Sequence, residues 1–267
     1  MKTMILKNTK YPANAVTCTF ALVIALSLAL SAARAEIIVS ETFDYPAGTP
    51  LAGAAGGAGT WSGAWIVHEA IPSAAVTSEG LRIGDGTANP SAAPGKNVIA
   101  AKRQFNRYRG DTIFVKYVFT AGPGTTTDAD RFGVALPSNK HGCLLLGSGL
   151  GGTGSEETDN RIAARIHDSG PNRITIPDTF VGPGVTYTVV AEWSKSTPGP
   201  KEPYNRLRLW LNPKAEEVAP APYRDLRHPE LRSEINWAGF YIADTEPGDV
   251  YTVKSITIAT TPEDVIN

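Results

Sequence analysis

The sequence has little cysteine and only one long hydrophobic run. Its 267 residues include 2 cysteines, and Cys18 lies inside that run near the N-terminus. Cys143 is the only cysteine after residue 35, so the rest of the chain cannot form an intramolecular disulfide. We therefore expect a fold that is stabilised by a hydrophobic core and not by covalent cross-links.

The single hydrophobic run belongs to a segment that is typical of an export signal. Lys2, Lys7 and Lys10 precede the apolar residues 20–30, and the segment ends in Ala33-Arg34-Ala35, the small-x-small pattern that signal peptidase cleaves. The run is shorter than the about 20 apolar residues of a membrane-spanning helix. We expect a signal peptide at residues 1–35 and a secreted protein, or one located in the periplasm or cell envelope.

The chain also lacks an excess of positive charge. After residues 1–35 it contains 21 basic and 26 acidic residues, because Lys2, Lys7, Lys10 and Arg34 fall in the signal segment. A nucleic-acid-binding protein usually has a basic surface, so this balance argues against nucleic acid as a partner. The same balance disfavours anionic polysaccharides as ligands.

Alternation of apolar and polar residues predicts about a dozen short strands. The clearest pattern spans 185–193 and places five apolar residues on one face: Val185, Tyr187, Val189, Ala191 and Trp193. The segment 204–211 places Leu207, Leu209 and Leu211 inward in the same way. Further strands are predicted at 37–43, 76–83, 98–105, 112–120, 132–136, 143–147, 162–167, 173–176, 238–242 and 251–258.

Turns separate these strands, and helix is nearly absent from the pattern. The sequence contains 26 glycines and 20 prolines, which supply the backbone angles that chain reversals need. Only residues 223–235 hint at a helix, and Pro229 interrupts them. We therefore predict an all-β fold, an antiparallel two-sheet sandwich of jelly-roll type, in one domain at residues 36–267.

Three segments resemble a known group of proteins. The first begins Glu41-Thr-Phe43-Asp44-Tyr45 and ends Trp61-Ser-Gly63-Ala-Trp65; the others are Trp210-Leu-Asn212-Pro213 and the final strand at 251–258. They resemble the start, the W-x-N-P corner and the last strand of laminin-G-like and concanavalin A-like jelly-roll proteins exported by environmental bacteria. The resemblance implies a concanavalin A-like fold. Because relatives range from sugar-binding modules to glycosidases and lyases, it implies little chemistry.

A local pair of catalytic carboxylates is missing. Glycosidases need two carboxylates across the scissile bond, and hydrolases of this fold usually carry them as E-x-D-x-x-E or E-x-D-x-E, neither of which occurs here. The acids Glu156, Glu157 and Asp159 follow a glycine-rich segment and are expected in a solvated loop. An enzyme would need carboxylates from separate strands, and Glu192, Asp168 and His167 would then be the first residues to examine.

Other catalytic and cofactor motifs are weak. The glycines at 147–152 have dinucleotide-binding spacing, but no amphipathic helix follows them. Cys143 shares an alternating face with His141, yet its leucine neighbours favour a buried structural thiol.

Metal ligands are sparse in the sequence. The resemblance implies a calcium site at a rim of the domain, and Asp128 and Asp130 are the candidate ligands for Ca²⁺. In the last strand, Lys254 and Ser255 replace an acidic pair that is common in the family, which argues against a cation there. The four histidines show no close pairing that would favour zinc.

Aromatic residues are the strongest candidates for ligand contacts, because sugar rings stack on tryptophan and tyrosine. Trp61 and Trp65 share one side of an extended chain, either as a binding pair or as a cover for the sandwich edge. A second candidate set lies opposite the inward leucines, on a face that binds glycan or is simply polar: Tyr204, Arg206, Arg208 and Trp210. We predict an exported, non-catalytic domain that binds carbohydrate or a cell-surface ligand. The alternatives are a polysaccharide hydrolase or lyase on the same fold, and a structural protein of the envelope or extracellular matrix.

Overall fold

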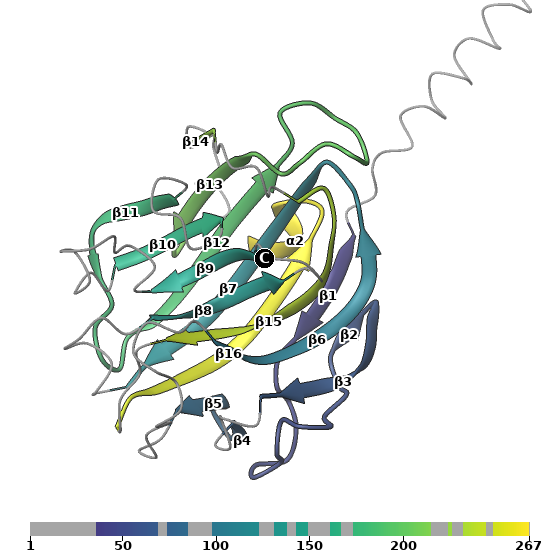
Figure 1. The fold of residues 1–267 in the computed structure, drawn as a ribbon. Coiled ribbons are helices and arrows are strands. Elements are labelled where there is room, and N and C mark those ends of the chain that lie inside the picture. The colour runs from purple at the N-terminus through teal and green to yellow at the C-terminus, as the bar shows by residue number, and fades with distance from the viewer. Residues whose placement is uncertain are drawn as a thin grey trace, which may run out of the picture. The chain divides into compact units, whose positions relative to one another are not determined.

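The computed structural model consists of two stacked antiparallel β-sheets (Figure 1). It describes residues 36–68, 74–84, 98–122, 131–137, 143–148, 161–166, 173–214, 224–225, 232–243 and 248–266. Residues 35–267 form one compact unit. Every strand pair among the described residues is antiparallel. The all-β two-sheet prediction is therefore confirmed.

The first sheet has nine strands and places β1 (Ile37–Glu41), from the start of the domain, beside β16 (Val250–Ala259), from its end. Its order is β14 (Arg224–Asp225), β13 (Arg206–Leu211), β12 (Thr186–Ser194), β7 (Thr112–Ala121), β16, β1 and β2 (Ala58–Gly59). In addition, β5 (Gly80–Gly84) pairs with β16, and β4 (Ala75–Thr77) pairs with β5.

The second sheet has seven strands. Its order is β11 (Arg173–Phe180), β10 (Arg161–Ile166), β9 (Cys143–Ser148), β8 (Arg131–Pro137), β15 (Ile235–Ala243), β6 (Val98–Tyr108) and β3 (Trp61–Val67). Strand β3 is not among the strands that the alternation predicts, and its sequence contains Gly63 after several glycines. It forms a strand because its backbone pairs with the edge of β6.

The core fills the space between the two sheets. Leu207 and Leu209 face it as the alternation predicts, and they are paired across β12 with Trp193 and Ala191. Phe119, Tyr117 and Phe132 form ring contacts in the interior at centroid distances of 4.8 to 6.2 Å. Burial of this apolar surface is the main term that stabilises a chain of this kind.

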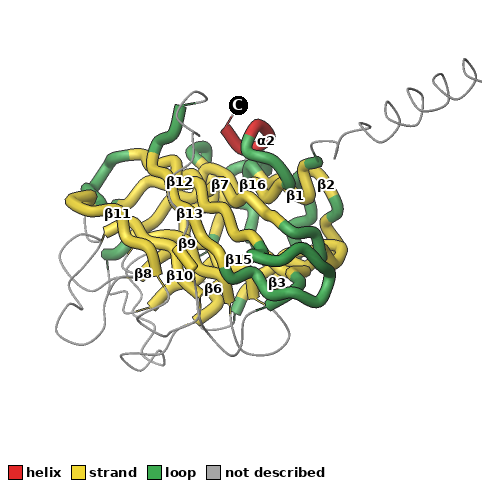
Figure 2. The backbone as a smooth tube through the Cα atoms, turned by 90° about the horizontal axis from the view of Figure 1, so that it is seen from above, coloured by secondary structure: helices red, strands yellow, loops and turns green. Residues whose placement is uncertain are grey.

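The outer face of the nine-stranded sheet carries a short helix, α2 (Glu263–Ile266), which the alternation pattern does not predict. Its Val265 packs with Phe114, Val190, Trp210 and Ala259 in a small apolar cluster on that face. Figure 2 shows α2 beside the ends of the central strands of this sheet. Within the described part of the chain, no helix is long and apolar enough to cross a membrane.

Candidate functional site

Trp61 and Trp65 point to the same side of β3, as the sequence predicts, and that side faces the core. Trp65 exposes 2% of its surface and stacks on Phe240 with a centroid distance of 5.4 Å. Trp61 lies half-buried against Trp65 and Phe105, at 5.7 and 6.0 Å. In this structure both indoles therefore cover the sandwich edge, which is the structural alternative that the sequence left open.

The two indoles pack around a buried ion pair that joins the sheets. Glu41 of β1 and Arg103 of β6 approach to 3.4 Å between Oε2 and Nη1, with side-chain exposures of 1% and 4%. The guanidinium also donates to the carbonyls of Gly63 and Gly56, at 2.9 and 2.6 Å. Its Cζ lies 4.8 Å from the ring centroid of Trp61. We call Glu41, Arg103, Tyr45, Trp61 and Trp65 the Glu41 cluster.

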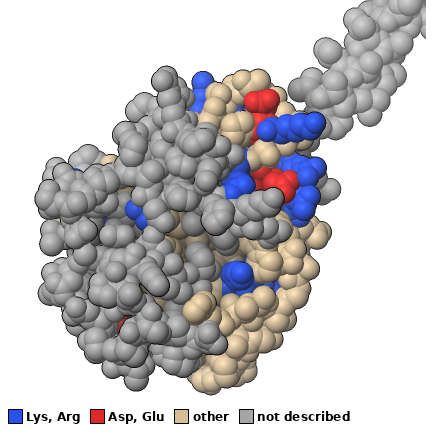
Figure 3. All heavy atoms as spheres, in the orientation of Figure 1, with Lys and Arg blue, Asp and Glu red and all other residues tan. Residues whose placement is uncertain are grey.

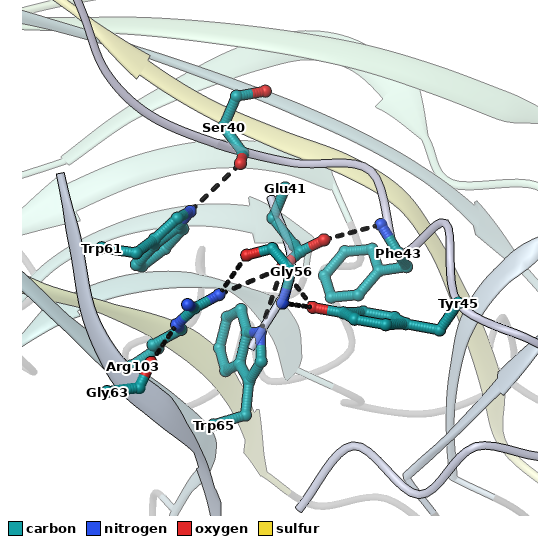
Figure 4. Close-up of polar contacts among 9 residues, drawn as sticks. All are labelled: Ser40, Glu41, Phe43, Tyr45, Gly56, Trp61, Gly63, Trp65 and Arg103. Atoms are coloured by element: carbon teal, nitrogen blue, oxygen red, sulfur yellow. Dashed lines mark hydrogen bonds and ion pairs between the residues drawn. The ribbon is translucent and has the colours of Figure 1, made fainter. Parts of the chain in front are cut away.

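The carboxylate of Glu41 is the acceptor at the centre of this cluster (Figure 4). Oε2 accepts from Tyr45 Oη at 2.8 Å and from Trp65 Nε1 at 3.3 Å, and Oε1 accepts from the backbone N of Phe43 at 3.0 Å. Tyr45 Oη in turn accepts from Gly56 N at 2.7 Å. These bonds fix residues 42–57 against both sheets, so the cluster positions the chain and leaves no reactive group exposed.

Tyr45 gives the Glu41 cluster a pH dependence. Burial, followed by the hydrogen bond to Glu41 and its negative charge, raises the pKa of Tyr45 from 10.0 to about 12. The folded state therefore keeps a proton that the unfolded chain releases above pH about 10, and stability falls as pH rises towards about 12. We expect Tyr45→Phe to lose less stability than the wild type across this window in urea unfolding. Equal slopes for the two proteins would contradict this assignment.

The second set of predicted ligand residues divides between two places. Tyr204 precedes β13 and lies in the core, where its hydroxyl donates to the carbonyl of Gly110 at 2.8 Å. Its predicted outward position is wrong because the strand begins only at Arg206, so the alternation does not extend back to it. Arg206, Arg208 and Trp210 do lie opposite the inward leucines, and Trp210 is 9% exposed in the apolar cluster with α2.

Glu192, the first acid to examine for catalysis, lies on the same outer face as Arg208. Its Oε2 is 3.7 Å from Arg208 Nη1, and its side chain is 5% exposed. The adjacent Trp193 points to the opposite side of β12, into the core. His167, Asp168, Glu156, Glu157 and Asp159 lie outside the described residues. A catalytic pair around Glu192 therefore stays a prediction.

The candidate calcium ligands Asp128 and Asp130 also lie outside the described residues, as does His141. Among the residues that the structure does describe, no group of three or more His, Cys, Asp or Glu side chains could hold a metal ion. Cys143 begins β9 opposite Pro137. The calcium site remains a prediction from the resemblance.

A different polar constellation lies on the outer face of the seven-stranded sheet, the face turned away from the core. Strand alternation places Tyr241 of β15 and Arg165 of β10 there, since their neighbours Phe240 and Ala164 face the core. Arg165 Nη2 donates to Tyr241 Oη at 3.4 Å. Arg165 and Tyr241 expose 3% and 1% of their surface.

Small residues surround this pair because larger side chains do not fit between the strands. Gly133 of β8 pairs with both Gly147 of β9 and Tyr241 of β15. A Cβ on Gly133 would collide with the carbonyl oxygen of Leu146, and one on Gly147 with that of Phe132. Ala135, Leu145 and Ala163 pack with Tyr241 in an apolar cluster. Small and apolar residues therefore surround the arginine and the phenol.

The strands of this sheet contain very few acidic residues. Six of its seven strands (β3, β6, β8, β9, β10 and β15) contain no Asp or Glu, and β11 contains one acid, Asp178. Arg165 and Arg161 lie on its outer face in β10, and Lys102 lies there in β6. The described strands therefore give this face basic and aromatic groups without carboxylates. We call the outer face of β10, β9, β8, β15 and β6 the basic face.

Exposed basic residues outside the basic face form ion pairs with acidic residues. Arg109 Nε and Arg107 Nε lie 2.7 and 3.4 Å from the carboxylate of Glu234. Figure 3 shows blue basic and red acidic side chains next to one another in the upper part of the surface that it presents. Surface pairs of this kind contribute little and do not mark a site.

Sequence reasoning missed Arg165 and Tyr241 although both strands were predicted. The signal that could have found them is a pair of basic residues four apart, and so on one face of a strand, Arg161 and Arg165, with alanines at 163 and 164 between them. The placement of β10 and β15 in one sheet, with β9 and β8 between them, cannot be read from spacing, because Arg165 and Tyr241 are 76 residues apart in the sequence. The tertiary fold alone brings the arginine and the tyrosine together.

Known proteins share the architecture of this chain at low sequence identity. No family model matches the sequence, and no curated protein is similar to it. A protein described as a β-glucanase from Mycobacterium abscessus has a TM-score of 0.50 at 13% identity, over 84% of this chain and 100% of its own. A β-1,3-glucanase from Mycobacterium marinum has a TM-score of 0.47 at 12% identity, over 84% and 98% of the two chains.

An alginate lyase solved in complex with an alginate tetrasaccharide has a TM-score of 0.47 at 11% identity, over 84% of this chain and 97% of its own. The β-glucanase from Mycobacterium abscessus shares the two-sheet architecture described above, in agreement with the predicted jelly-roll sandwich. The laminin-G-like label stays a prediction. At such identities the similarity describes the fold and leaves the activity open.

Proposed function

We propose that this protein acts on an acidic polysaccharide and that the basic face is where it binds the chain. The observation that carries the proposal is the contact of Arg165 with Tyr241 on a sheet whose strands are nearly free of acids. A guanidinium binds a sugar carboxylate with two parallel hydrogen bonds. A phenol provides both a surface for a sugar ring and a group that exchanges protons.

The net charge of the chain argued against such a ligand, and the basic face reverses that inference. The excess of acids is a property of the whole sequence, whereas a ligand responds to the potential close to its site. At physiological ionic strength, charges are screened beyond about 8 Å. Arg165, Arg161 and Lys102 therefore contribute local positive charge to the basic face even though the whole chain carries an excess of acids.

The reaction class that fits this geometry is β-elimination on a uronic acid residue. Arg165 binds the uronate carboxylate and neutralises the charge that develops there, which makes the proton on the adjacent C5 more acidic. Tyr241 accepts that proton as the general base. The C4–O bond breaks, a C4–C5 double bond forms, and the leaving oxygen takes a proton from Tyr241 or from water.

Hydrolysis is supported less well by the described residues. A glycosidase needs two carboxyl groups about 5 to 9.5 Å apart. The buried acids among the described residues are Glu41, Glu192 and Asp249, and Glu41 is enclosed in the Glu41 cluster. Glu41 and Glu192 lie on opposite sides of the nine-stranded sheet, because Glu41 faces the interior and Glu192 faces away from it.

Binding without chemistry is the second candidate, and burial favours it. Tyr241 is 1% exposed, so a sugar must displace some of its surroundings before the phenol can reach C5. In that case Arg165 and Tyr241 hold the sheet together, and only the exposed basic groups on the face contact the glycan.

One experiment separates these functions. Purified protein is incubated with alginate, pectate and hyaluronan as acidic polysaccharides and with β-1,3-glucan and xylan as neutral ones. We expect the ultraviolet absorbance of a new unsaturated uronate with at least one acidic substrate and no reducing ends released from the neutral substrates. Retardation in an acidic polysaccharide gel without such absorbance would support binding alone. Failure to bind any acidic polysaccharide would contradict the proposal.

A further inference from the structure

Phe180 is the most exposed large hydrophobic residue in the part of the chain that the structure describes. It ends β11, the strand at one edge of the seven-stranded sheet (Figure 1), and 61% of its surface is exposed. A single apolar residue on a surface needs no explanation by itself. Phe180 differs from such a residue because its neighbours fix both its backbone and the side of the sheet on which its ring lies.

The backbone of Phe180 is held by Tyr187 of β12. Tyr187 Oη accepts from Gly182 N at 2.8 Å and donates to the carbonyl oxygen of Phe180 at 3.4 Å. Tyr187 is itself fixed, because its ring stacks on Phe119 at a centroid distance of 5.6 Å. Val181, the residue after Phe180, is buried in the core. The exposed ring therefore projects from a backbone that is held in place before any ligand binds, which reduces the entropic cost of a contact.

Strand pairing places Phe180 beside Arg161 on the outer side of the sheet. Phe180 lies directly opposite Arg161 of β10, and such partners have Cβ atoms about 4.5 to 5.5 Å apart on one side of the sheet. That side is the outer one, because the neighbours Val181 and Ile162 face the core. The register of the two strands shifts between Arg161 and Ala163, and irregularities of this kind redirect nearby side chains.

This pair lies at the edge of the basic face, away from its buried centre. Arg165 and Tyr241 expose 3% and 1% of their surface, whereas Phe180 is mostly exposed and Arg161 is half-buried. Arg161 and Arg165 are four residues apart on one strand, which corresponds to about 13 Å at about 3.3 Å per residue. A ligand at the edge can therefore contact Phe180 and Arg161 from the side without reaching the centre of the sheet.

We infer that Phe180 and Arg161 form a surface binding site for one uronate residue of an acidic polysaccharide, an inference that rests on the proposed function. The apolar C–H face of the sugar packs on the phenyl ring. The guanidinium has five N–H donors, so it can bind the sugar carboxylate as well as a neighbouring group of the protein. The site holds the polysaccharide at the edge of the domain and takes no part in the proton transfer assigned to Tyr241.

The test measures the affinity for alginate by calorimetry and the melting temperature of each protein. We expect Phe180→Ala to lower the affinity about three- to tenfold and Phe180→Trp to retain it, because stacking needs an aromatic ring. Arg161→Gln is expected to weaken binding and to reduce its dependence on salt. Turnover at saturating alginate should not change in Phe180→Ala, because the ring does not contact the reacting atoms.

Val185→Ala is the matched control. Val185 is 46% exposed and lies at the other end of the turn that follows Phe180, so its substitution also removes an exposed apolar side chain. Both variants should melt close to the wild type, because an exposed side chain contributes little packing. Val185→Ala is expected to bind alginate as the wild type does.

Phe180→Trp also reports the contact directly. We expect alginate to shift the emission of the new, exposed tryptophan and to protect it from quenching by acrylamide, in comparison with the wild type under the same conditions. An emission difference that alginate does not change, although alginate is bound, would contradict the site.

The outcomes distinguish the site from the proposed function. If the wild type binds no acidic polysaccharide, the proposed function fails and the site fails with it. If the wild type binds alginate and both Phe180→Ala and Arg161→Gln match its affinity, the site is refuted while the proposed function stands. Equal losses in Phe180→Ala and Val185→Ala would also refute it. Loss of self-association in Phe180→Ala, measured by sedimentation with unchanged affinity for alginate, would assign the ring to an interface between copies of the chain instead.

Discussion

Tyr241→Phe is expected to lower the turnover of an acidic polysaccharide by a factor of about 10² to 10⁴, the range that a general acid or base contributes. The substitution removes one hydroxyl and keeps the ring that packs with Ala135, Leu145 and Ala163. Binding of the polysaccharide should persist, because Arg165 still carries its charge. The measurement is the initial rate of unsaturated uronate formation, together with the affinity in a polysaccharide gel.

Tyr117→Phe is the matched control for this experiment. Tyr117 lies in β7 with 0% exposure, and within the described part of the chain its hydroxyl has no hydrogen-bond partner. Removal of that hydroxyl changes the interior of the sandwich and leaves the basic face intact. Undiminished turnover in Tyr241→Phe would rule out the proton-transfer role. Equal losses in both variants, with lowered melting temperatures, would point to a stability effect.

Arg165→Gln tests the contribution of the positive charge of Arg165 while it keeps a hydrogen-bond donor at that position. Glutamine retains a donor but cannot neutralise a carboxylate, so we expect weaker binding of acidic polysaccharide as well as slower turnover. Tyr241→Phe should change mainly the rate. This difference between the two variants follows from the roles assigned to them.

The largest effect on stability is expected at the Glu41 cluster. Glu41→Ala leaves the guanidinium of Arg103, which is 4% exposed, without its carboxylate, and loss of one partner of a buried pair costs about 3 to 5 kcal/mol. The same change removes the acceptor for Tyr45 Oη, Trp65 Nε1 and the backbone N of Phe43. Urea unfolding at neutral pH measures the difference in the free energy of unfolding.

Glu234→Ala provides the comparison on the surface. Glu234 also forms ion pairs with two arginines, but the side chains of Arg107 and Arg109 are 52% and 51% exposed. An exposed pair is worth about 0 to 1 kcal/mol, so this variant should unfold almost as the wild type does. A double variant, Glu41→Leu with Arg103→Met, should lose less stability than Glu41→Ala, because no buried charge is left. Similar costs for Glu41→Ala and Glu234→Ala would contradict the central role of the cluster.

The Glu41 cluster also explains why the two tryptophans suggested a binding site from the sequence. Four-residue spacing places Trp61 and Trp65 on one side of an extended strand, and that part of the prediction is confirmed. The spacing carries no information on which side faces the core. That side is decided by β6, whose Arg103 and Phe105 lie beneath the indoles.

The W-x-N-P corner determines the local turn but not the tertiary contacts of its tryptophan. Asn212 has a φ of 45°, its Oδ1 accepts from Thr188 N at 2.8 Å, and its own N donates to Thr188 O at 2.7 Å. Asparagine tolerates this left-handed conformation better than most residues. The motif therefore fixes the turn that ends β13, but it does not determine what Trp210 contacts. Helix α2, from the far end of the chain, packs with that indole.

The sequence by itself determined the fold class of this protein. Period-two alternation and glycine-proline turns are local properties, so the strands and most inward residues, such as Leu207, Leu209 and Trp193, follow from the order of residues along the chain. The tertiary structure alone decided which outward residues meet. Arg165 and Tyr241, on strands separated by β9 and β8, touch only because the sheet order places them on one face, and strand order depends on long-range pairing that no local pattern encodes.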